Sequence, residues 1–102
     1  MAEYVRILAQ SELPQAGMVR DVTVAGRSLC VANVNGAICV LDGTCPHEGG
    51  PLGEGTIEDG RVVCPWHSYA FDVHTGEAQD DPSVKAEILE AKVENGELHV
   101  KL

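Results

Sequence analysis

Residues 89–102 have the sequence LEAKVENGELHVKL, in which apolar and polar residues alternate on both sides of an Asn-Gly pair. Alternation is typical of a β-strand with one buried face, and Asn-Gly favours a two-residue hairpin turn because both residues tolerate positive φ. A turn at Asn95-Gly96 pairs apolar with apolar residues and leaves His99 among solvent-facing polar groups. The expected pairs are Val93 with Leu98, Ala91 with Val100, Leu89 with Leu102, Glu90 with Lys101 and Lys92 with His99. The end of the chain therefore predicts an antiparallel hairpin.

Pairs of turn residues divide the rest of the chain in the same way. They are Ala25-Gly26, Asn35-Gly36, Asp42-Gly43, Asp59-Gly60 and Thr75-Gly76. Short apolar runs lie between them, at residues 4–8, 19–25, 29–34, 37–41, 62–64, 69–73 and 84–93, and no long helical period is visible. In the last run the apolar phase changes between Ile88 and Leu89, which indicates a bulge or a break. We expect one all-β domain over residues 1–102, with eight or nine short strands.

Two of the four cysteines fall in the predicted hairpin around Asn35-Gly36. Its register places Cys39 opposite Ala32 and leaves Cys30 a diagonal neighbour on the same face. Diagonal neighbours are usually too far apart for a disulfide. We therefore interpret both cysteines as small buried hydrophobic residues.

Composition excludes several classes of protein. The chain has 102 residues, 44% of them hydrophobic, which is too apolar for general disorder. The longest apolar run, Ala37–Leu41, is far too short to span a bilayer. Glu3 and Arg6 interrupt the N-terminus and no secretory signal is visible, so we expect a cytoplasmic protein with no membrane association. With 7 basic and 16 acidic residues, the chain lacks the clustered cations that nucleic acid requires.

The negative charge is concentrated in residues 42–81. The formal net charge of the chain is −9, and this segment contains nine of the acids against one base, Arg61. The acids are Asp42, Glu48, Glu54, Glu58, Asp59, Asp72, Glu77, Asp80 and Asp81. Two interpretations remain open: a surface that meets a basic partner, or a solvated face that aids solubility.

The same segment contains two loops with metal-binding side chains, Cys45-Pro46-His47 and Cys64-Pro65-Trp66-His67. Each loop offers one thiol and one imidazole, and the glycines after His47 leave room for close backbone approach to a bulky group. Two thiolates and two imidazoles satisfy tetrahedral zinc. They equally satisfy a two-iron cluster with two sulfurs on one iron and two nitrogens on the other. Spacing alone leaves both open, although structural zinc sites usually carry a C-x-x-C pair.

The combined pattern C-P-H-x16-C-P-W-H, followed by Ser68-Tyr69-Ala70-Phe71-Asp72, resembles the two-box signature of Rieske 2Fe-2S proteins. The resemblance implies the small antiparallel Rieske fold, with a cluster-binding subdomain of two loops at about residues 42–82. It implies one 2Fe-2S cluster, with Cys45 and Cys64 on the inner iron and His47 and His67 on the outer one. Asp80-Asp81-Pro82 lies where the family places a third, proline-containing loop.

Some positions depart from the respiratory members of the family. Those proteins carry an extra cysteine in each box, joined by a disulfide, where this chain has Gly50 and Trp66. They also present a serine and a tyrosine hydroxyl to the cluster where this chain has Tyr69 and Phe71. Because donors to sulfur stabilise the reduced cluster, the resemblance implies a potential near the low end of the family range of roughly −150 to +300 mV.

The resemblance also implies a role. With neutral imidazoles, the charges of two ferric ions, two sulfides and two thiolates cancel, so the cluster accepts one electron more easily than a four-cysteine cluster. The exposed edges of His47 and His67 would pass the electron, with Trp66 and Leu52 as apolar docking surface. Shielding of the cluster is an equal interpretation for Trp66.

Only His74 and His99 remain for a second iron site, so we expect a carrier that is not itself an enzyme. The resemblance implies a monomeric ferredoxin that takes electrons from a flavin-dependent ferredoxin reductase and delivers them to a terminal oxygenase, through basic partner surfaces. A Rieske-like subunit of an assimilatory nitrite reductase and a zinc-stabilised binding module are the alternatives.

Overall fold

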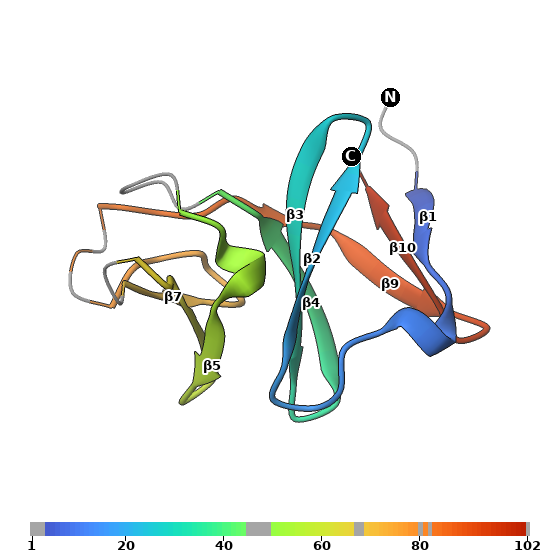
Figure 1. The fold of residues 1–102 in the computed structure, drawn as a ribbon, viewed down its shortest axis with the longest axis horizontal. Coiled ribbons are helices and arrows are strands. Elements are labelled where there is room, and N and C mark those ends of the chain that lie inside the picture. The colour runs from blue at the N-terminus through green and yellow to red at the C-terminus, as the bar shows by residue number, and fades with distance from the viewer. Residues whose placement is uncertain (1–3, 45–49, 67–68, 80, 82, 102) are drawn as a thin grey trace.

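The computed structural model describes residues 4–44, 50–66, 69–79, 81 and 83–101. Within them the chain forms short strands arranged in three antiparallel sheets, which confirms the predicted all-β class (Figure 1). The strands are β1 (Tyr4–Leu8), β2 (Val19–Val24), β3 (Arg27–Val34), β4 (Ala37–Asp42), β5 (Thr56–Glu58), β6 (Arg61–Val63), β7 (Ala70–Asp72), β8 (Ile88–Leu89), β9 (Ala91–Glu94) and β10 (Glu97–Lys101). Two 3-10 turns, η1 (Gln10–Glu12) and η2 (Leu52–Glu54), complete the described elements.

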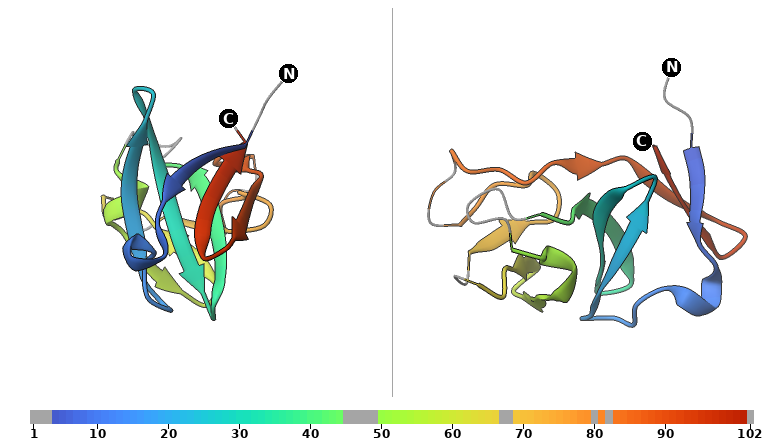
Figure 2. Two further views of the ribbon diagram at one scale, coloured as in Figure 1. Left: turned by 90° about the vertical axis from the view of Figure 1, so that its right-hand side faces the viewer. Right: turned by 45° about the horizontal axis from the view of Figure 1, so that its top comes forward.

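The sheet β2-β3-β4-β8 lies at the centre and is covered on both faces (Figures 1 and 2). Successive residues of a strand point to opposite faces. Leu29 and Val31 of β3 pack with the β1-β10-β9 sheet, in a core that also contains Leu98 and Val100. Cys30 and Ala32 on the other face pack with the β5-β6-β7 sheet. Burial on both faces explains why β3 contains a continuous apolar run.

The predicted C-terminal hairpin is confirmed. β9 and β10 pair Val93 with Leu98, Ala91 with Val100 and Lys92 with His99. Both turn residues have positive φ, 53° at Asn95 and 78° at Gly96. Glu90 and Lys101 also meet, through a backbone hydrogen bond of 2.8 Å and a side-chain ion pair of 3.9 Å. Leu102 lies outside the described residues, so its pairing with Leu89 stays a prediction; Leu89 pairs with Val40 of β4.

The strand predicted at residues 84–93 begins only at Ile88 and is divided between two sheets. β8 pairs with β4 in the central sheet, whereas β9 pairs with β10. The expected break is present, and it lies at Glu90, one residue after the point that the apolar phase indicated. The sequence also missed β5, which forms a hairpin with β6 across Asp59-Gly60.

The predicted register around the two cysteines is confirmed, whereas the predicted burial is confirmed for Cys30 and not for Cys39. Cys39 pairs with Ala32, and Cys30 and Cys39 are free thiols. Cys30 is fully buried, whereas Cys39 is half-buried. Burial, with a smaller contribution from the charge of Asp21, raises the pKa of the Cys30 thiol to about 12. Cys30 is therefore a core residue.

The β5-β6-β7 sheet is attached to the central sheet through η2, which lies against β2. A Cβ on Gly53 would lie 2.5 Å from the Cα of Asp21, so only glycine permits this approach of two backbones. Gly43, where the chain leaves β4, is equally close to Ser28 of β3. The glycine contacts thus fix η2 and the start of the first loop to the central sheet. None of the helical turns in the described parts of the chain is long and apolar enough to cross a bilayer.

Candidate metal centre

The first predicted ligand loop leaves β4 and returns at η2, and hydrogen bonds close its base. The backbone N–H of Leu52 donates to the carbonyl of Gly43 at 2.8 Å, and Thr44 and Pro51 form an antiparallel bridge. The Asp42 carboxylate accepts a hydrogen bond from the N–H of Thr44 at 2.9 Å. Both ends of the loop are therefore held to the central sheet, immediately before Cys45 and after Gly50.

The second loop connects β6 to β7 and is closed in the same manner. The N–H of Cys64 donates to the carbonyl of Tyr69 at 2.7 Å. Cys64 is 1% exposed and belongs to the core between the central sheet and the β5-β6-β7 sheet. Its thiol is free of any disulfide in the structure. The loop thus places Cys64 on the buried side, at the end of a strand.

The two loops meet where Gly50 approaches Cys64 and Trp66. A Cβ added to Gly50 would lie 3.0 Å from Cys64 Sγ and 3.0 Å from two indole carbons of Trp66. This is closer than ordinary van der Waals contact. The end of the first loop therefore packs directly on the second, beside the cysteine sulfur. The sequence singled out Gly50 and Trp66, but it gave no sign that they touch each other.

Of the four predicted ligands, the structure describes Cys64. Cys45, His47 and His67 lie outside the described residues, so the ligand set stays a prediction. Among the residues that are described, no group of three or more His, Cys, Asp or Glu side chains could hold a metal ion. The chemistry of Cys64 fits the expected group, because it offers a buried free thiol at the point where the two loops meet, and a thiolate is the ligand that an iron-sulfur cluster takes.

The roles expected for the apolar residues need one correction. Leu52 was predicted as docking surface, but it is fully buried in the core with Cys64. An apolar residue in a turn can point inward or outward, and the sequence does not decide which. Trp66 is 58% exposed. Phe71 is fully buried and Tyr69 is partly buried against the same core, with their ring centroids 6.3 Å apart.

The third predicted loop has described flanks. The N–H of Ala78 donates to the carbonyl of Val84 at 2.9 Å, and the N–H of Val84 donates to the carbonyl of Asp81 at 2.9 Å. Gln79 is held to β7, its N–H donating to the carbonyl of Ala70 at 2.8 Å. The residues on either side of the predicted proline loop therefore form a tight turn attached to the β5-β6-β7 sheet. Asp80 and Pro82 lie outside the described residues.

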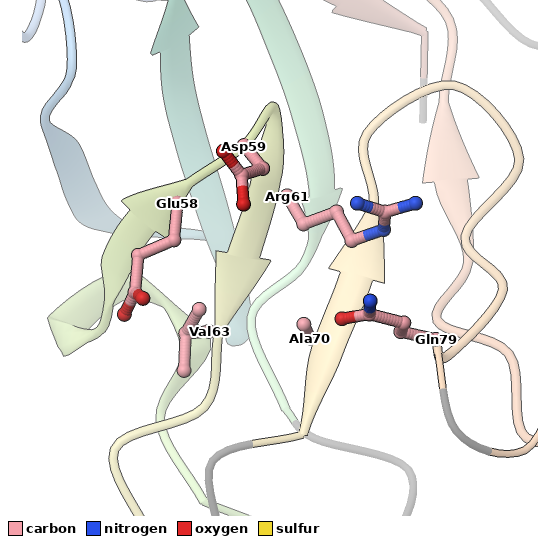
Figure 3. A pocket seen from close by; sticks show the side chains of 6 residues that line it. All are labelled: Glu58, Asp59, Arg61, Val63, Ala70 and Gln79. Atoms are coloured by element: carbon pink, nitrogen blue, oxygen red, sulfur yellow. The ribbon is translucent and has the colours of Figure 1, made fainter.

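A hollow lies on the other face of the β5-β6-β7 sheet. It has a volume of about 240 Å³, and Arg61 and Gln79 extend toward each other across it (Figure 3). Glu58 and Asp59 lie at its edge. No cysteine or histidine is among its described lining residues. The hollow is a polar surface feature, distinct from the face that carries Cys64.

Comparison with known proteins agrees with the geometry. The family model of the Rieske [2Fe-2S] domain matches residues 3–98. The chain belongs to this family. The cofactor of this Rieske protein is one Rieske-type 2Fe-2S cluster, as the two-box resemblance implied.

Relatives of this Rieske protein include free ferredoxins and much longer chains. It is 32% identical over 99 residues to "Ferredoxin CarAc" of Metapseudomonas resinovorans, a match that covers 95% of this chain and 92% of the relative. It is 33% identical over 86 residues to "Apoptosis-inducing factor 3" of Homo sapiens, covering 83% of this chain. The match spans only 14% of that human protein, so it concerns the Rieske domain alone.

Solved structures show the same fold. One is a chain from the complex of reduced oxygenase and oxidized ferredoxin in carbazole 1,9a-dioxygenase, with a TM-score of 0.84 and 31% identity. The match covers 96% of this Rieske protein and 92% of that chain. A putative NADH-dependent nitrite reductase small subunit from Mycobacterium tuberculosis has a TM-score of 0.89 at 21% identity, covering 100% of this chain and 96% of that one. At that identity the second match shows the fold alone.

Proposed function

We propose that this Rieske protein is a one-electron carrier, the ferredoxin component that takes electrons from a flavin-dependent reductase and delivers them to a terminal oxygenase. In this proposal residues 1–102 form one domain and the protein is a cytoplasmic monomer. The chain has no catalytic residues of its own. Its chemistry is the reversible uptake of one electron by the bound 2Fe-2S cluster.

The proposed ligands are Cys45 and Cys64 for the inner iron and His47 and His67 for the outer one. What supports this set is the contact between Gly50, Cys64 and Trp66, since it brings the ends of both loops to one point. Each loop offers one thiol and one imidazole. Two such loops side by side supply sulfur to one iron and nitrogen to the other.

The described residues would hold the cluster in a fixed position, with water excluded on the side of Cys64. The backbone hydrogen bonds at Gly43–Leu52 and Cys64–Tyr69 pin both loops to strands, which limits structural change when the electron arrives. Cys64 is buried among apolar side chains, including Phe71 and Leu52, so water is excluded on that side. Cluster ligands supported in this manner favour rapid electron transfer without rearrangement.

The oxygenase system is proposed from the similarity to a chain of the complex of oxygenase and ferredoxin in carbazole 1,9a-dioxygenase, which is 31% identical and is covered over 92% of its length. The acidic segment at residues 42–81 supports a basic partner surface, because opposite charges steer two proteins toward each other. In such a case the second-order rate constant of electron transfer falls as salt screens the attraction.

The test starts with the purified holoprotein. We expect iron and inorganic sulfide in equal amounts, a visible absorption spectrum that bleaches on reduction, and an electron paramagnetic resonance signal in the reduced state. Zinc without sulfide would contradict the proposal and establish the binding module. Stable copurification with a large reductase subunit would favour the nitrite reductase alternative.

The second stage measures electron transfer. A flavin-dependent ferredoxin reductase should reduce the protein with a rate constant that decreases as ionic strength rises from about 0.01 to 0.15 M. The reduced protein should then support turnover of a ring-hydroxylating oxygenase. A rate that is independent of salt would contradict the basic partner surface, while leaving the carrier role intact.

A further inference from the structure

The two loops that carry the proposed ligands, residues 45–50 and 64–69, are each held to their own strands by backbone hydrogen bonds. The first loop is closed at Gly43–Leu52 and the second at Cys64–Tyr69. Neither hydrogen bond joins one loop to the other. Among the described residues, Gly50 at the end of the first loop packs against both Cys64 Sγ and the indole of Trp66 in the second.

The reason for glycine at position 50 is the space around it. Its φ lies outside the left-handed region, so other residues could adopt the backbone conformation. A Cβ, however, would lie 3.0 Å from Cys64 Sγ and 3.0 Å from both Cγ and Cδ2 of Trp66. Carbon atoms in good contact lie about 3.5–4.0 Å apart. The absent Cβ therefore lets the backbone of the first loop lie against the indole.

Trp66 is the partner that makes this contact broad. It is the single tryptophan of the chain and is 58% exposed, yet its ring lies against a buried glycine. A large flat side chain contributes dispersion attraction over its whole covered face at a small cost in side-chain entropy. One face of the indole can thus hold Gly50 while the rest remains in water.

We propose that Trp66 is a positioning residue that clamps the two cluster loops together by packing its indole on the bare Cα of Gly50. This inference rests on the proposed function, because it assumes that both loops hold the cluster. The clamp fixes the separation of the loops on the side where Cys64 enters. Loss of the indole frees the first loop to move away from the second, so the cluster is released sooner.

The same geometry leads to a second, independent expectation. The added Cβ at position 50 lies 3.0 Å from Trp66 Cγ, which is itself one C–C bond, about 1.5 Å, from Trp66 Cβ. The two Cβ positions are therefore at most about 4.5 Å apart, within the range that a disulfide requires. The double variant Gly50→Cys with Trp66→Cys should form a disulfide that replaces the clamp.

The main experiment compares variants of the holoprotein by the rate at which visible absorbance is lost to an iron chelator. We expect Trp66→Ala to lose its cluster about tenfold faster or more, since removal of a group that orients metal ligands typically weakens binding to that extent. Trp66→Phe keeps an aromatic face and should remain close to the wild-type rate. Met18→Ala is the matched control, because Met18 is 56% exposed and lies in the segment before β2.

A double-mutant cycle separates the clamp from a general structural effect. Gly50→Ala pushes the indole away, so it should accelerate cluster loss in the wild-type background. In the Trp66→Ala background there is no ring to displace, and the added methyl group should have a smaller effect. The reduced-state electron paramagnetic resonance spectrum and the midpoint potential should shift in Trp66→Ala and return in Trp66→Phe.

The outcomes are distinguishable. If the wild-type protein assembles a cluster but Trp66→Ala loses it at the rate of Met18→Ala, the clamp is wrong and the proposed function stands. If the wild-type protein assembles no cluster, the proposed function fails. Peptide mapping of the double cysteine variant tests the contact separately, because a disulfide between positions 50 and 66 supports the contact on which the clamp depends, and its absence under oxidising conditions refutes the clamp.

Discussion

Replacement of Leu52 by alanine tests whether the first cluster loop is anchored in the core or presents apolar surface to a partner. Leu52 is fully buried, and the glycine that follows it leaves no space against Asp21 of β2. The site cannot collapse easily, so the substitution leaves a cavity. Buried Leu→Ala changes cost about 2–5 kcal/mol, and we expect about 3 kcal/mol at this position.

The assay is thermal unfolding, followed by far-UV circular dichroism and by visible absorbance of the holoprotein. For a domain of this size, about 3 kcal/mol lowers Tm by roughly 12 °C or more. Met18→Ala removes a side chain of similar size from an exposed site and should change the stability by less than about 0.5 kcal/mol. Below the unfolding transition, Leu52→Ala should exchange electrons with a reductase at nearly the wild-type rate.

The opposite pattern would refute the reasoning. If Leu52→Ala unfolds at the temperature of Met18→Ala but slows electron transfer, Leu52 belongs to the docking surface, as the sequence suggested. If the Tm falls and the transfer rate is unchanged, the residue is an anchor. The same two measurements on Trp66→Ala should give a smaller stability loss, because Trp66 is 58% exposed.

Three further predictions concern single residues. The backbone N–H groups of His74 and Thr75 donate to the Asp72 carboxylate, and these hydrogen bonds lower the pKa of Asp72 below its usual value. The stability that these hydrogen bonds provide is present above the pKa of Asp72 in the unfolded state, and it is lost as the pH falls through the lower pKa of the folded state. Asp72→Asn keeps the acceptor oxygen but does not titrate. This variant should therefore lose less Tm than the wild type as the pH is lowered. The Cys30 thiol, buried and with its pKa raised to about 12, should stay unlabelled by iodoacetamide at about pH 8 while the protein is folded, as measured by mass spectrometry, and rapid labelling would contradict its burial. A redox titration should give a midpoint near the low end of roughly −150 to +300 mV, because Phe71 offers no hydroxyl, and a midpoint well above zero would show that other donors compensate.

The sequence predicted the hairpins well, because turn chemistry and apolar alternation agree within a few residues. Asn95-Gly96 determines both the turn and the register of β9 with β10. The β3-β4 register, with Ala32 opposite Cys39, follows from the same signals around Asn35-Gly36. Local information was sufficient in both cases, since each strand pairs with the next one along the chain.

Contacts between distant segments could not be predicted in this way. The run at residues 84–93 resembles one strand with a flaw, because nothing in its composition says that its halves join different sheets. β5 contains three residues, too few to show a period. The contact of Gly50 with Trp66 and the inward direction of Leu52 depend on how loops pack on sheets, which residue spacing does not record.

For the candidate metal centre, the sequence identified the family and predicted the ligands, and the structure added the backbone contacts that support the loops. Ser28 and Asp42 hold the start of the first loop: Gly43 donates to the Ser28 carbonyl at 2.8 Å, and Thr44 to the Asp42 carboxylate at 2.9 Å. Neither residue is part of a recognisable motif. Sequence alone identifies a residue that holds a loop only when the position that it contacts is already known.

The passage of the chain through Glu90 has a consequence for engineering. Leu89 belongs to the central sheet and Ala91 to the sheet of β1 and β10, with one residue between them. A link of one residue allows little relative movement, so it couples the position of β8 to that of the β9-β10 hairpin. Inserting two glycines after Glu90 should loosen one sheet from the other, whereas the same insertion between Asn95 and Gly96 only lengthens a turn. New termini for a permuted or split protein therefore belong at the turn.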